Sequence, residues 1–124
     1  MTTSRDGLRV ACPEGFVRRA ASPHLVFVQQ GRLRTPMRIS VWLADDAPTL
    51  PGAQTHELAS GRASFIREVS EGGSGGQVHV LRAYRPAGAG AIVLEAEVQQ
   101  EFGEPDFGPA WAVLAEAELT QSDE

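Results

Sequence analysis

The sequence has no lysine, a single cysteine, few aromatic residues and no long apolar run, and these absences exclude several classes of protein. Because Cys12 has no second cysteine to pair with, the chain can form neither an internal disulfide nor a zinc ribbon. Nowhere does the sequence contain the roughly 18 consecutive apolar residues that a membrane-spanning helix needs. With 42% hydrophobic residues, the chain is nonetheless too apolar to be disordered. We therefore predict one folded domain over residues 1–124, with loose termini at 1–7 and 120–124.

Basic and acidic residues are distributed differently along the chain. All eleven basic residues are arginines, and the last of them is Arg85. The part up to Arg85 has seven acids, whereas the part from Pro86 onward has nine acids and no basic residue. The net charge of −5 argues against nucleic acid as a partner, because phosphate binding needs a basic face. The acidic part favours a cationic protein surface or a metal ion as its partner, or else a solvated face whose acids pair with arginines of neighbouring strands.

Segments of alternating or β-branched residues predict an antiparallel sheet. We expect strands at 8–12 (resumed at 16–17), 24–29, 37–44, 62–70, 77–84 and 91–99, with loops at 45–52, 71–76 and 85–90. Glycines in the last two loops allow the positive φ angles that hairpin connections of this width need. In the segment 91–99 apolar and polar residues alternate, so Glu95 and Glu97 are expected side by side on an outer face.

The period of the apolar residues changes after Pro105. Asp106 is a suitable N-cap, and apolar residues follow it at helical spacing, namely Phe107, Trp111, Leu114 and Leu119. This pattern predicts an amphipathic helix of about three turns that packs on the sheet. Residues 56–60 show a second, weak helical pattern. The predicted fold class is α+β, a largely antiparallel twisted sheet of about six strands backed by a C-terminal helix.

Motifs for catalysis or for binding small ligands are scarce. The three histidines (His24, His56 and His79) lack the spacing of a metal site, and Cys12 stands in no nucleophile motif. The glycine cluster 72–76 joins two strands and lacks the lysine and the serine or threonine that complete a phosphate-binding loop.

Three carboxylates, Glu101, Glu104 and Asp106, lie close together in the sequence. They are near enough to form an acid pair or a calcium cluster, although their spacing is not that of an EF-hand. An exposed acidic turn before a helix explains them equally well. The residues alone therefore predict neither an enzyme nor a cofactor.

A series of short motifs resembles one known family. The motifs are PEGF (13–16), PMRI (36–39), GGSGG (72–76), HVLRAY (79–84), IVL (92–94), QQE (99–101), EPDF (104–107) and AWAVL (110–114). Together they are similar to the immunity proteins that protect bacteria from muramidase effectors, which are peptidoglycan-cleaving proteins delivered by type VI secretion. The resemblance spans roughly residues 8–119 and implies a PsbP-like fold.

The resemblance also implies inhibition by occlusion, in which a non-catalytic protein covers the active-site cleft of its cognate effector. The residues expected to contact the effector are Gly73, Ser74, Gly75, Glu101, Glu104 and Asp106. Acids at such an interface would steer the protein to a cationic groove, with no cofactor or, alternatively, with calcium at the interface. The implied location is the periplasm. Because residues 1–8 contain no secretion signal, this location requires a leader that has been removed, and the alternative is the cytoplasm.

Two other functions remain open from the sequence. A cytoplasmic PsbP-like chaperone for a type VI effector would expose an apolar patch of several hundred Å². The short, proline-broken segment 45–61 argues against it, since such chaperones carry a fuller helix there. A small hydrolase would use Glu101 or Glu104 and would need a carboxylate pair in a concave pocket.

Overall fold

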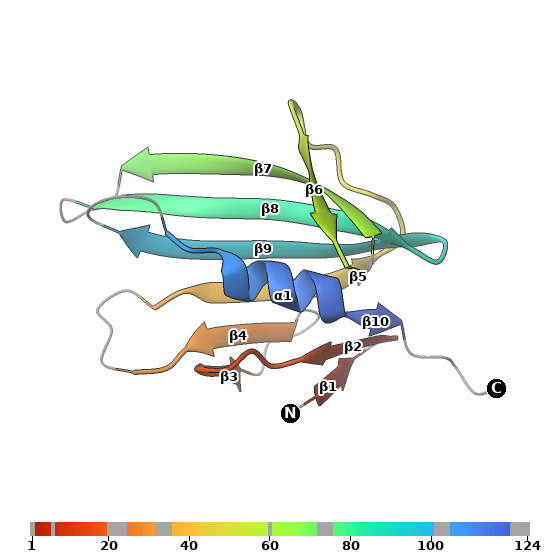
Figure 1. Ribbon diagram of the computed structural model, residues 1–124, viewed down its shortest axis with the longest axis horizontal. Helices are drawn as coiled ribbons and strands as arrows, with labels where there is room; N and C mark the ends of the chain where they lie inside the picture. Colours follow the sequence, from red (N-terminus) through yellow and green to blue (C-terminus); the bar gives the residue numbers. More distant parts are fainter. Residues whose placement is uncertain are drawn as a thin grey trace.

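A computed structural model describes residues 2–5, 7–19, 25–31, 36–59, 61–71, 76–100 and 105–119 (Figure 1). These residues form two antiparallel sheets and one helix. The large sheet has the order β3-β4-β5-β9-β8-β7-β6, with β3 (Phe16–Arg19), β4 (Leu25–Gln29), β5 (Arg38–Ala44), β6 (Gln54–Leu58), β7 (Gly61–Glu71), β8 (Gln77–Ala87) and β9 (Gly90–Gln100). The small sheet has the order β1-β2-β10, with β1 (Thr2–Arg5), β2 (Leu8–Ala11) and β10 (Glu118–Leu119). The helix is α1 (Gly108–Glu116).

In the strands β5 and β9 apolar and polar residues alternate between the buried face and the opposite face, as the sequence predicts. In β5 Ile39 and Val41 are fully buried, whereas Arg38 between Met37 and Ile39 is exposed. In β9 the apolar residues at 92, 94, 96 and 98 are buried and Glu97 is exposed. Burying one face of a strand stabilises its register, because a slip by one residue would turn every apolar side chain toward water.

The core lies between one face of the large sheet and a second layer made of α1 and β2. Figure 1 shows α1 in front of the large sheet, with β10 continuing from the helix toward β2. Phe27, Leu81 and Leu94 from the sheet pack with Leu114 from α1 and Val10 from β2. All five side chains are almost fully buried, and each such burial stabilises the fold by about 1.5–3 kcal/mol. We call the other face of the large sheet, which is turned away from α1, the outer face.

The structure corrects several details of the sequence prediction. The large sheet has seven strands instead of about six, because residues 54–58 form the edge strand β6. The weak helical pattern at 56–60 is overridden by pairing of β6 with β7, in which Leu58 stands opposite Gly61. The β8–β9 connection is a tight turn of Gly88 and Ala89, with φ of 58° at Gly88, and not a wide loop. The helix ends at Glu116, so Leu119 lies in β10.

The N-terminal residues are part of the small sheet. Residues 1–7, assigned above to a loose terminus, include β1, which pairs with β2, and residues 120–124 lie outside the described part of the chain. Within the described residues, no helical segment combines the length and the apolar character that crossing a bilayer requires.

Candidate functional site

The predicted contact residues belong to two segments that leave the same end of the large sheet. Gly73, Ser74, Gly75, Glu101 and Glu104 themselves lie outside the described residues. The strand ends that hold these segments are described, and they are neighbours. Glu71 at the end of β7 stands opposite Gln77 at the start of β8, and Gln77 stands opposite Gln100 at the end of β9. The glycine segment and the acidic segment are therefore anchored side by side, although 25 or more residues separate them in sequence.

Asp106 is described, and it lies directly before α1 near this same end. Its side chain is exposed, and its Oδ1 accepts a hydrogen bond of 2.8 Å from the Gly108 N–H. The N-cap residue is Phe107, so the prediction that Asp106 itself is the N-cap is wrong by one position. The next residue, Phe107, lies under the guanidinium of Arg67 on β7, with 5.2 Å from Cζ to the ring centroid. A carboxylate here stabilises the positive end of the helix dipole and remains open to solvent.

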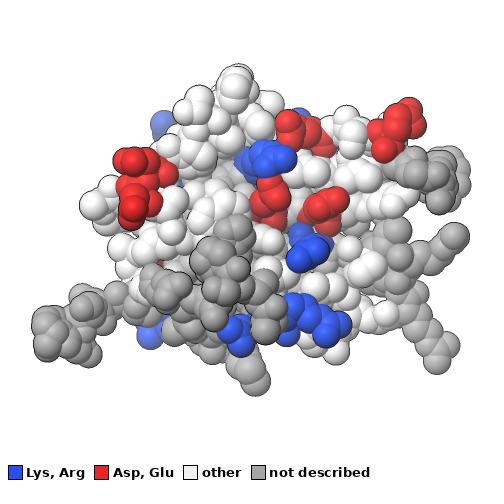
Figure 2. Space-filling model, turned by 180° about the vertical axis from the view of Figure 1, so that it is seen from behind, with Lys and Arg blue, Asp and Glu red and all other residues white. Residues whose placement is uncertain are grey.

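An ion-pair network crosses the outer face of the sheet. Arg82 of β8 donates from Nε to Glu68 of β7 at 2.8 Å, and its Nη1 donates to Glu95 of β9. Hydrogen bonding to Glu68 raises the pKa of Arg82, burial opposes this, and the charge of Glu95 adds to the rise. Figure 2 shows acids and arginines gathered on this face. The three side chains are between 36% and 54% exposed, so each pair contributes less than about 1 kcal/mol to stability.

The outer face confirms one sequence prediction and adds residues that the sequence did not single out. Glu95 and Glu97 do point to the same face. Glu68 and Arg82 were not predicted as partners. Arg82 stands directly opposite Glu95, whereas Glu68 stands opposite Val80, two residues before Arg82. Arg82 therefore reaches Glu68 diagonally across the two strands. Glu97 stands opposite Arg38 of β5, which continues the row of charged residues.

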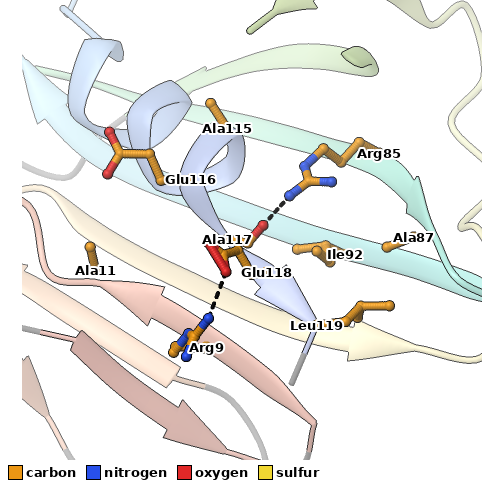
Figure 3. A pocket seen from close by; sticks show the side chains of 10 residues that line it. All are labelled: Arg9, Ala11, Arg85, Ala87, Ile92, Ala115, Glu116, Ala117, Glu118 and Leu119. Atoms are coloured by element: carbon orange, nitrogen blue, oxygen red, sulfur yellow. Dashed lines mark hydrogen bonds and ion pairs between the residues drawn. The ribbon is translucent and has the colours of Figure 1, made fainter. Parts of the chain in front are cut away.

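On the other side of the molecule a cavity of about 870 Å³ lies between β2, β8, α1 and β10 (Figure 3). Arg9 donates from Nη2 to Glu118 at 2.7 Å across its mouth. Arg85 reaches from β8 to the last turn of α1, where Nε donates to the Leu114 carbonyl at 2.8 Å and Nη2 donates to the Ala117 carbonyl. Burial lowers the pKa of Arg85, although an arginine stays charged at neutral pH.

The chemistry of this cavity is that of a structural junction. The carboxylate of Glu118 is bound by Arg9, and Arg85 is bound by backbone carbonyls that the end of a helix leaves without partners. Among the described residues, no group of three or more histidine, cysteine, aspartate or glutamate side chains is arranged to hold a metal ion. Two glutamates line the cavity, Glu116 and Glu118, and both side chains are exposed to solvent.

The remaining reactive side chains are packed in the fold. His79 is 4% exposed in β8, between Val69 and Val98 of the neighbouring strands. His56 stacks on Trp111 of α1 with ring centroids 4.0 Å apart, and Phe65 meets Trp111 edge-on at 5.2 Å. The Cys12 thiol donates to the Phe16 carbonyl at 3.3 Å. The ring contacts attach β6 to α1, and the thiol contact links the residue after β2 to the start of β3. His24 lies outside the described residues.

A family model and a curated relative both match this chain, and they indicate the same family. The family model described as "Type six secretion immunity 3 domain" matches residues 9–118. The chain is 40% identical over 117 residues to the immune protein Tsi3 of Pseudomonas aeruginosa PAO1, and the match covers 94% of this chain and 80% of that protein. A crystal structure from Bacteroides thetaiotaomicron VPI-5482 superposes with a TM-score of 0.66 at 13% identity, covering 95% of this chain. The chain spans about half (47%) of the length of that structure, and the likeness is one of fold.

Proposed function

We infer the function of this chain from one premise, that it belongs to the type six secretion immunity 3 domain family and is an immunity protein of type VI secretion. We propose that it protects the cell by binding a cognate peptidoglycan-degrading muramidase effector and covering its active-site cleft. In this proposal the protein is an inhibitor and catalyses no reaction. The covering element is the sheet end that carries the segments 72–75 and 101–104.

This mechanism is supported by the positions of the two segments, which both start at the same end of the large sheet. Their anchors, Glu71, Gln77 and Gln100, stand side by side at the ends of three long strands. Two connections that start beside each other at one end of the sheet could enter a single cleft of the effector together. The glycine segment lets the backbone approach a partner closely, and the acidic segment supplies charge beside it.

Charge supports the same proposal. Glu71 and Asp106 are exposed at this end, and Glu101 and Glu104 belong to the same acidic stretch of sequence. By contrast, Glu68 and Glu95 are paired with Arg82 on the outer face, which reduces the negative potential there. Acids at the end of the molecule would accelerate association with a cationic groove, and the gain would decrease as salt is added.

Three further properties belong to this proposal. We propose that the fold is PsbP-like and that the protein acts in the periplasm, where a cell-wall effector would meet it. Its inhibition requires no cofactor. Calcium held between the acidic segment and the effector is an alternative arrangement, and it predicts that a chelator weakens the complex.

Neutralising the acidic segment without changing its shape tests the proposed contact. We expect the triple variant Glu101→Gln, Glu104→Gln, Asp106→Asn to raise the Kd for the cognate effector about tenfold or more, mainly by slowing association at low salt. The amide oxygen of the asparagine introduced by Asp106→Asn can still accept the hydrogen bond from Gly108, so α1 keeps its start. The measurement is surface plasmon resonance at two salt concentrations.

The matched control neutralises two exposed acids at the opposite end of the sheet. Asp45 and Asp46 follow β5, whose last residue, Ala44, stands opposite Ala91 near the start of β9. The double variant Asp45→Asn, Asp46→Asn should leave the Kd within about twofold of the wild type, because charges beyond a Debye length from the contact are screened. An equal loss of affinity in both variants would show that net charge matters and that the acidic segment is no specific contact.

A further inference from the structure

One edge of the large sheet is only partly covered. The eleven-residue strand β7 pairs with β8 over residues 64–71 but with the edge strand β6 only over residues 61–65. On the side of β6, no strand among the described residues pairs with residues 66–71. Figure 1 shows β6 crossing one end of β7 and leaving the rest of its edge open. Alternate residues of such an edge direct N–H and C=O groups outward, where another strand can bind them.

The side chains of this edge are arranged on both faces of the sheet. Arg67 lies on the helix side, since it contacts Phe107, and alternation places Val69 and Glu71 on that side too. Glu68 lies on the outer face with Arg82, together with Ser70. Val69 is 53% exposed, more than the other exposed large apolar residues of the described chain. An apolar side chain in the middle of an open edge is typical of a strand that pairs with another chain.

We propose that two copies of this protein pair antiparallel along this edge, across a two-fold axis that passes beside Val69. In this register Val69 stands opposite Val69 of the second copy. Arg67 then stands opposite the second copy's Glu71, and Glu68 stands opposite its Ser70. The two-fold axis repeats each contact, so the dimer has two Arg67–Glu71 pairs and one central apolar contact. The two large sheets become one continuous sheet.

Other registers are less favourable for the same sequence. A two-fold axis perpendicular to the sheet keeps both helix layers on one side, so residues of the same face must stand opposite each other. Centring the axis on Glu68 would bring two glutamates together, and centring it on Arg67 would bring two arginines together. Centring it on Ser70 would place Val69 against Glu71. Like charges directly opposite each other destabilise a strand pair, whereas opposite charges and apolar pairs stabilise it.

The surface that a single strand pair buries is small, so we expect a weak dimer whose population depends on concentration. Sedimentation equilibrium of the full chain should show an average mass that rises from 13.3 kDa toward twice that value as the concentration increases. The variants Val69→Lys and Glu71→Arg should each raise the dimer dissociation constant about tenfold or more, because each brings like charges together.

A charge exchange gives the sharpest test. Arg67→Glu alone should weaken the dimer, and combining it with Glu71→Arg should restore the dissociation constant to within about threefold of the wild type, since the opposite charges meet again. Glu71→Arg leaves the contact between Arg67 and Phe107 unchanged, so its effect does not arise from loosening α1. Glu57→Arg on the exposed strand β6 is the matched control and should not change the dissociation constant.

Three results would overturn the dimer. They are a wild type that stays monomeric at every concentration, single variants that associate like the wild type, and a double variant that regains nothing. A monomeric chain whose Val69→Lys variant binds the effector less tightly would assign the edge to the effector instead. The dimer shares only Glu71 with the proposed effector-binding end, and its central residue Val69 lies outside that end. If the dimer does not form, the proposed function is therefore unaffected.

Discussion

The variant Phe27→Ala should lose about 3–5 kcal/mol of the free energy of unfolding, as truncations of fully buried aromatic side chains do. Phe27 is the largest of the fully buried side chains and lies in β4, opposite Ile39 of β5. Removing its ring leaves a cavity between the large sheet and the second layer. Because a domain of this size is stable by only about 5–15 kcal/mol, the variant should unfold at a much lower urea concentration.

Val69→Ala provides the control for Phe27→Ala in the same urea titration. Val69 is 53% exposed, so at a protein concentration where the chain is monomeric its truncation should change the stability by no more than about 0.5 kcal/mol. A loss below about 1 kcal/mol for Phe27→Ala would contradict the description of the core, since it would mean that the ring is not enclosed as described.

Arg85→Met should destabilise the protein by about 2 kcal/mol, because charge-assisted hydrogen bonds to the end of a helix are lost. Arg85 bonds the carbonyls of Leu114 and Ala117 and so attaches the end of α1 to β8. Methionine keeps much of the length of the side chain and removes the guanidinium. Urea unfolding measures the overall loss, and hydrogen exchange should show faster exchange in the last turn of α1.

The arginine three residues earlier on the same strand is the matched control. Arg82 points to the outer face, where it pairs with Glu68 and Glu95 in a partly exposed network. Arg82→Met should therefore change the stability by less than about 1 kcal/mol. If the two variants lost equal stability, the contact of Arg85 with α1 would have no special role in holding the helix.

Local sequence patterns predicted most of the strands and the helix of this fold. Burial of the apolar residues in β5 and β9 follows directly from their alternation, and the helix begins close to the predicted position. β6 was missed because its sequence, QTHEL, has no apolar alternation, and pairing with β7 alone makes it a strand. The opposite roles of Arg82 and Arg85 also depend on position, since two arginines of one strand meet different layers.

The candidate site depends on contacts between strands that are distant in the chain. The sequence predicted the glycine segment and the acidic residues separately, and Asp106 is indeed exposed beside α1. That their anchors are neighbours follows from the pairing of β7, β8 and β9 in register, with Gln77 between Glu71 and Gln100. The open edge of β7 was not predicted, because it depends on where β6 ends and not on the sequence of β7 itself.

A titration of the effector with this protein distinguishes occlusion of the cleft from binding without inhibition. Increasing amounts of this protein are added to a fixed concentration of the purified cognate effector, and cleavage of peptidoglycan is measured. Occlusion of the cleft predicts that cleavage decreases in proportion to the added protein and stops when every effector molecule is bound. A complex that forms tightly while cleavage continues at its original rate would contradict occlusion and would favour the role of a chaperone.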